Sequence, residues 1–144
     1  MFEVDFSEPL LIVGFGNLLQ QDDGAGVLVI QKLRELKLPE NIWVVEGGVM
    51  GVDTISLFEN YSQVILVDCV NVSNSDEQIF EFQLDDVSLK SNDFRFSLHE
   101  LNLNTVSTLM ETLKIEVPRI LFLGIKPEKV GFGLEVSENV KLAV

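Results

Sequence analysis

Three side chains suited to metal or acid–base chemistry stand next to strand-like or helix-like segments of this chain. Asp23 lies between an apolar run and a helix-like pattern, Asp68 directly follows the most apolar run, and His99 immediately precedes another helix-like pattern. Because ligands of open α/β sheets usually bind at the carboxyl ends of the strands, we expect all three side chains at one sheet edge. Carboxylate and imidazole groups suit nickel, zinc and iron. The three residues therefore predict a divalent metal site.

Each of these residues also has a purely structural interpretation. Asp22 or Asp23 could cap the helix that follows, and Asp68 could form a turn at the end of its strand. His99 could be a helix cap or a half-buried packing group. The spacing of the residues does not separate these interpretations from a metal site.

Apolar runs and helical periodicity alternate along the chain. Short apolar runs that end at turn residues predict strands, and apolar residues at every third or fourth position predict helices. Strands are predicted at 10–13, 42–45, 64–67 and 119–123, with a half-exposed edge strand at 80–84; helices are predicted at 27–36, 52–58, 100–113 and 135–144, and a loop at 85–96. The alternation predicts an α/β fold, a three-layer α/β/α sandwich around a mostly parallel twisted sheet of about five strands. The pattern does not predict the strand order.

Length and charge restrict the classes of function. The 144 residues suit a single domain that spans 1–144. A net charge of −13 would repel phosphate backbones, so we expect no nucleic-acid partner. No apolar run approaches the ~20 residues of a membrane-spanning helix, and acidic residues rather than basic ones stand at the start, so we expect a cytoplasmic protein without membrane contact. Cys69, the only cysteine, is expected to be a small buried apolar group rather than a nucleophile.

The glycine-rich loop after the first apolar run allows a second interpretation. Gly14-Phe-Gly16 is similar to the start of a dinucleotide-binding fingerprint, and Glu46 at the end of the second predicted strand could hold a ribose. However, Leu19 stands where the third glycine belongs, and two carboxylates stand at the helix start where a pyrophosphate would bind. A nucleotide-binding α/β protein is therefore the weaker alternative. We predict instead that the glycines of this loop, Gly14, Gly16, Gly24 and Gly26, shape a tight turn.

Five blocks in sequence order carry a resemblance to a known family. They are Gly14 to Val27 (GFGNLLQQDDGAGV), Glu46-Gly-Gly, Val64 to Asp68 (VILVD), Ser97-x-His99, and Phe122 to Glu128 (FLGIKPE) with Val130-Gly-Phe. These blocks resemble the hydrogenase maturation endopeptidases, proteases that remove a C-terminal extension from the large subunit of nickel-iron hydrogenases. The fifth block is most similar to the branch that serves hydrogenases of formate hydrogenlyase-type complexes.

The resemblance implies a function and a site. Asp23, Asp68 and His99 fall on the metal-binding and catalytic positions of this family, whose members are classified as aspartic-type endopeptidases. It implies that the chain has no cofactor of its own, that nickel belongs to the hydrogenase large-subunit precursor, and that cadmium or zinc can occupy the site. The expected partner is the C-terminal region of that precursor, and the expected oligomeric state is a monomer. A non-catalytic nickel-sensing chaperone of the precursor would use the same residues and is the alternative.

The chain departs from the family pattern in three places. Glu46 stands where the family usually has Asp, and Cys69 stands where Ala is common. The sequence stops at Val144, before the longer final helix of many relatives. None of these departures involves the three predicted ligands.

Overall fold

The computed structural model describes residues 4–48, 58–72, 77–83, 94–96, 112, 114, 118–128, 131 and 133–144. In this part of the chain, helical segments separate the first two strands and follow the last one, as the sequence pattern predicts. In chain order the elements are β1 (Leu10–Phe15), the short 3-10 helix η1 (Asp22–Gly24), α1 (Ala25–Arg34), β2 (Ile42–Gly48), β3 (Gln63–Val72), β4 (Ile79–Gln83), β5 (Phe94–Phe96), β6 (Arg119–Ile125) and α5 (Glu138–Ala143). No helix in these ranges is long and apolar enough to cross a membrane.

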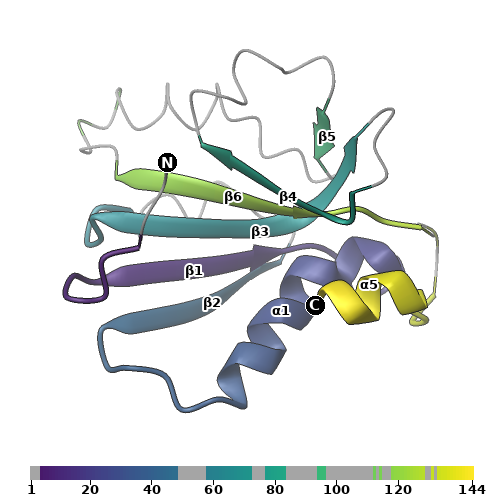
Figure 1. Ribbon diagram of the computed structural model, residues 1–144, viewed down its shortest axis with the longest axis horizontal. Helices are drawn as coiled ribbons and strands as arrows, with labels where there is room; N and C mark the ends of the chain where they lie inside the picture. Colours follow the sequence, from purple (N-terminus) through teal and green to yellow (C-terminus); the bar gives the residue numbers. More distant parts are fainter. Residues whose placement is uncertain are drawn as a thin grey trace.

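One sheet forms the centre of the fold, with its strands in the order β2-β1-β3-β6-β4 (Figure 1). The pairs β1/β2, β1/β3 and β3/β6 are parallel, whereas β4 pairs antiparallel with β6 at one edge. This arrangement confirms the predicted mostly parallel sheet of about five strands. Parallel pairing also brings the carboxyl ends of β1, β2, β3 and β6 together along one end of the sheet, which we call its carboxyl edge.

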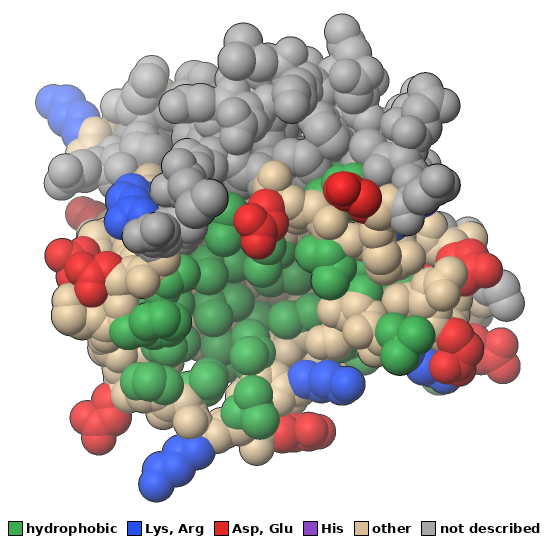
Figure 2. Space-filling model, viewed as in Figure 1, with side chains coloured by type: hydrophobic (Ala, Val, Ile, Leu, Met, Phe, Trp, Pro, Cys, Tyr) green, Lys and Arg blue, Asp and Glu red, His purple; other side chains and the backbone are tan. Residues whose placement is uncertain are grey.

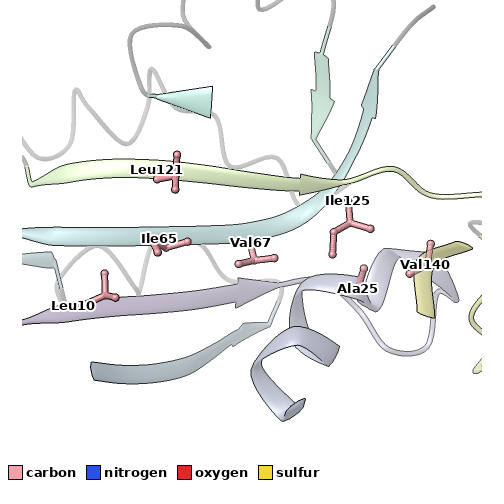
Figure 3. Packing of buried hydrophobic residues seen from close by; sticks show 7 residues of the cluster. All are labelled: Leu10, Ala25, Ile65, Val67, Leu121, Ile125 and Val140. Atoms are coloured by element: carbon pink, nitrogen blue, oxygen red, sulfur yellow. The ribbon is translucent and has the colours of Figure 1, made fainter. Parts of the chain in front are cut away.

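The described helices cover one face of the sheet. Ala25 of α1 and Val140 of α5 belong to the same buried cluster as strand residues of β1, β3 and β6 (Figure 3). Apolar side chains remain visible on this face beside the helices, with acidic side chains around its margin (Figure 2). The helices predicted over 52–58 and 100–113 fall almost wholly outside the described residues, so the third layer of the sandwich remains a prediction.

Several predicted boundaries are wrong, and the final helix, for example, begins at Glu138 instead of residue 135. The predicted loop at 85–96 contains strand β5, which pairs antiparallel with Val70–Val72 and was missed because three residues are too few for a recognisable period. Strand β3 does not end at Asp68 but continues to Val72, because pairing with β5 replaces pairing with β1. Strand β2 extends past its predicted end at residue 45 to Gly48, and its pairing with β1 shifts register beyond Glu46.

Candidate functional site

The loop between β1 and α1 folds back tightly on η1. Gly16 has a φ of +139°, a conformation that residues with a Cβ rarely adopt. A Cβ on Gly16 would lie 2.0 Å from the carbonyl oxygen of Asp23, and a Cβ on Gly14 would lie 2.1 Å from that of Gly26. These close approaches confirm that the loop needs glycine, and they bring Asp23 next to the end of β1.

Asp23 occupies η1 and is only 1% exposed. Its Oδ2 accepts a hydrogen bond of 3.3 Å from the backbone N–H of Asn17. Gly24 is the N-cap residue of α1 and Gln21 that of η1, and neither helix has a side-chain cap. The interpretation of Asp22 or Asp23 as an N-cap is therefore wrong, and the burial of both carboxylates needs another explanation.

Asp68 lies within β3, opposite Gly124 of the neighbouring strand β6. It follows Val67, the last residue of β3 that pairs with β1, so it stands where the parallel sheet begins to open. The side chain is 5% exposed, and its Oδ1 accepts a 2.7 Å hydrogen bond from the backbone N–H of Cys69. Because β3 continues beyond this point, the interpretation of Asp68 as a strand-end turn residue is wrong.

Three acidic residues of the site act electrostatically on the thiol of Cys69. Burial raises the pKa of this thiol, and the negative charges of Asp68, Asp23 and Asp22 raise the pKa further. Strand β3 and η1 are also in contact. The thiol, which is 3% exposed, therefore stays protonated at neutral pH, and the prediction that Cys69 is a buried apolar group is confirmed.

The structure thus brings two of the three predicted site residues to the carboxyl edge of the sheet. The third, His99, lies outside the described residues. Within the part of the chain that the structure describes, no three side chains of ligand type are grouped to hold a metal ion. The complete three-residue site therefore remains a prediction.

Asp22 is a site feature that sequence reasoning missed. This carboxylate is fully buried and accepts hydrogen bonds from the backbone N–H of Glu128 at 2.8 Å, the backbone N–H of Ser137 at 2.8 Å and the Ser137 hydroxyl at 2.7 Å. Its partners follow it by 106 and 115 residues, and no local pattern signals contacts of that range. The two adjacent acids therefore have different surroundings.

Glu46 does not support the nucleotide-binding alternative. It is exposed and forms an ion pair of 3.3 Å with Arg34 of α1. The start of α1, where a pyrophosphate would bind, is preceded by the buried carboxylates of Asp22 and Asp23. Negative charge at that position disfavours a phosphate ligand.

Known proteins are similar to this chain in sequence and in fold. A model of the hydrogenase maturation protease family matches residues 27–144. The hydrogenase 3 maturation protease of Escherichia coli K12 is 30% identical over 132 residues, covering 90% of this chain and 80% of that protein. The solved structure of the hydrogenase maturating endopeptidase HybD from E. coli has a TM-score of 0.78 at 21% identity, covering 93% of this chain and 83% of that chain. At that identity the structural likeness supports the α/β fold alone.

Other relatives are longer than this chain. It spans 65% of the length of HoxM, a hydrogenase expression/formation protein of Azotobacter vinelandii, with 27% identity over 134 residues that cover 92% of this chain. It spans 58% of the length of HupD of Rhodobacter capsulatus, with 26% identity over 121 residues that cover 83% of this chain. The family model nevertheless extends over most of the chain and includes β2, β3 and β6. This chain therefore belongs to the hydrogenase maturation protease family.

Proposed function

We propose that this chain is a cytoplasmic endopeptidase that removes the C-terminal extension of a nickel-iron hydrogenase large-subunit precursor after nickel insertion. The observation that carries the proposal is the position of Asp23 and Asp68, two buried carboxylates at one sheet edge, in a member of the hydrogenase maturation protease family. The names of its relatives describe a hydrogenase maturation protease and a hydrogenase maturating endopeptidase.

Nickel enters this proposal as part of the substrate. Asp23, Asp68 and the sequence-predicted third ligand His99 would engage the nickel of the precursor, since carboxylate and imidazole both bind this ion. Cleavage would then depend on prior metal insertion, because a nickel-free precursor offers the side chains nothing to bind. The protease would act as a checkpoint on hydrogenase assembly.

In peptide hydrolysis a water molecule loses a proton and adds to the scissile carbonyl, and the C–N bond then breaks as the leaving amine takes up a proton. Either polarisation by nickel or proton abstraction by a carboxylate can promote the attack. Of the two described acids, Asp68 lies within strand β3 and pairs with Gly124 of β6, whereas Asp23 lies in a short turn. We assign Asp68 the larger part in the chemical step and Asp23 the larger part in engaging nickel.

The test is cleavage of purified precursor, with and without nickel, followed by mass spectrometry of the released C-terminal peptide. We expect release only from nickel-loaded precursor, and loss of release with Asp23→Ala. Glu46→Gln is the matched control, because Glu46 is an exposed acid at the same sheet edge and should tolerate the change. Binding of nickel-loaded precursor without any peptide release would instead support the nickel-sensing chaperone.

A further inference from the structure

Two segments that are far apart in the sequence are joined beside the candidate site. The carboxylate of Asp22 binds the backbone N–H groups of Glu128 and Ser137 and the Ser137 hydroxyl. Figure 1 shows α5, which begins directly after Ser137, beside the start of α1, and Val140 and Ala25 share one buried cluster. The contact therefore attaches the C-terminal segment, which follows β6 and ends at Val144, to the turn that carries Asp23.

Backbone hydrogen bonds join the same two segments a few residues away. Gly133 donates its N–H to the carbonyl of Leu19 at 2.7 Å and accepts from the N–H of Gln21 at 3.0 Å. Gln21 has φ of 55° and ψ of −120°, an unfavourable conformation for a residue with a side chain. Such a conformation persists only where surrounding contacts enforce it, and such positions cluster at functional sites.

The strained backbone leads directly to Asp23. The N–H of Asp23 donates to the carbonyl of Gln20 at 3.2 Å, and the N–H of Gly24 donates to that of Gln21 at 3.1 Å. Neither η1 nor α1 has a side-chain cap, and the local bond from the Asn17 N–H to the Asp23 carboxylate is long, at 3.3 Å. The position of Asp23 therefore depends on residues that are themselves bound to Gly133 and, through Asp22, to Ser137.

We propose that Asp22 is a positioning residue that, with Glu128, Gly133 and Ser137, forms a clamp holding Asp23 in the geometry needed to bind a divalent metal ion. The inference rests on the proposed function, in which Asp23 engages the nickel of the precursor. Both carboxylate oxygens of Asp22 accept hydrogen bonds from the C-terminal segment, so Asp22 serves the fold of the site while Asp23 serves the metal. The C-terminal segment thereby controls metal binding at a distance in sequence of more than one hundred residues.

The experiment measures the affinity of the full chain for Cd²⁺ and Ni²⁺ by titration calorimetry, well below the unfolding temperature of every variant. Asp22→Asn places an amide N–H₂ against one of the donors whichever way it turns, and Ser137→Ala removes only the hydroxyl bond. We expect Asp22→Asn to weaken metal binding ~10–100-fold, the usual effect of losing a residue that orients a ligand. Ser137→Ala should give a smaller loss in the same direction.

Gln63→Ala is the matched control for stability. Gln63 is also fully buried and hydrogen bonded, to the backbone N–H and carbonyl of Asp5, but at the amino end of β3. Gln63 lies five positions before Asp68 along β3, a distance of ~16 Å at the usual rise of about 3.3 Å per residue. The control should lower the melting temperature without changing the metal affinity of the folded protein.

Amide hydrogen exchange over residues 17–24 gives a readout that does not depend on metal. We expect faster exchange there in Asp22→Asn and Ser137→Ala, and unchanged exchange in Gln63→Ala. Unchanged metal affinity in both clamp variants, while Asp23→Ala still abolishes binding, would overturn the clamp and leave the proposed function intact. Unchanged affinity in Asp23→Ala would overturn the metal role of Asp23, and the clamp with it.

Discussion

Replacing Gly16 with Ala tests whether the close fold of the β1–α1 loop is a requirement of the site. A Cβ at this position would lie 2.0 Å from the carbonyl oxygen of Asp23, 3.1 Å from its carbonyl carbon and 3.2 Å from the Cα of Gly24. All three atoms belong to the backbone, so no side-chain rotation can relieve the contact. The loop must move, and Asp23 must move with it.

The cost of Gly16→Ala has two parts. Holding a residue with a Cβ at a φ of +139° costs ~1–3 kcal/mol as backbone strain. Forcing a methyl group against the backbone of η1 costs a further ~1–3 kcal/mol. The sum, roughly 2–6 kcal/mol, is a large share of the ~5–15 kcal/mol by which a typical domain is stable. At about 3 °C per kcal/mol for a domain of this size, the melting temperature should fall by roughly 6–18 °C.

Thermal unfolding followed by circular dichroism measures this change, with Gly131→Ala as the control. A Cβ on Gly131 would meet only the Gln21 Oε1 at 3.5 Å, an ordinary contact, and its φ lies outside the left-handed range. That variant should match the wild type or gain up to ~1 kcal/mol from a less flexible unfolded chain. A Gly16→Ala melting temperature within ~2 °C of the wild type, or an equal fall in Gly131→Ala, would refute the reasoning.

Three further predictions concern the site. The folded pKa of Cys69 lies above the ordinary thiol value of 9.0, so the unfolded chain loses this proton first as the pH rises. The free energy of unfolding of the wild type, relative to that of Cys69→Ala, should then fall by ~1.4 kcal/mol per pH unit above pH 9. The same difference in urea midpoint between the two proteins at pH 8 and at pH 10 would contradict this. Asp68→Asn should still retain nickel-loaded precursor in a pull-down but cleave it at least ~100-fold more slowly; near-normal cleavage would rule out its chemical role. His99→Ala should weaken Cd²⁺ binding in calorimetry, and unchanged affinity would remove His99 from the predicted site.

The sequence predicts the parts of the fold that depend on local pattern. The central strands are recognisable because parallel strands covered on both faces are continuously apolar, as in Val64–Val67. Strand order is different, since it depends on which strands the crossovers bring together. The extension of β3 to Val72 likewise depends on pairing with β5, which comes more than twenty residues later.

The same difference between local sequence pattern and long-range contact applies to the candidate site. Asp23 and Asp68 are predictable because one stands in a strand-to-helix loop and the other follows an apolar run. The different tasks of Asp22 and Asp23 cannot be predicted from the sequence, because two adjacent aspartates are chemically identical until their partners are known. Ser137 is the N-cap residue of α5, so its local pattern indicates a helix start and not the hydrogen bonds that it donates to Asp22.

The two described acids of the site are supported in different ways, and this difference has a functional consequence. Asp68 is positioned by the pairing of β3 with β6, which does not involve the C-terminal segment after β6. Asp23 is positioned by a turn whose geometry depends on that segment through Asp22 and Gly133. Damage to the clamp should therefore weaken engagement of nickel while the strand-borne carboxylate stays in place. In kinetic terms, clamp variants should raise KM for nickel-loaded precursor more than they lower kcat, whereas Asp68→Asn should lower kcat with little effect on KM.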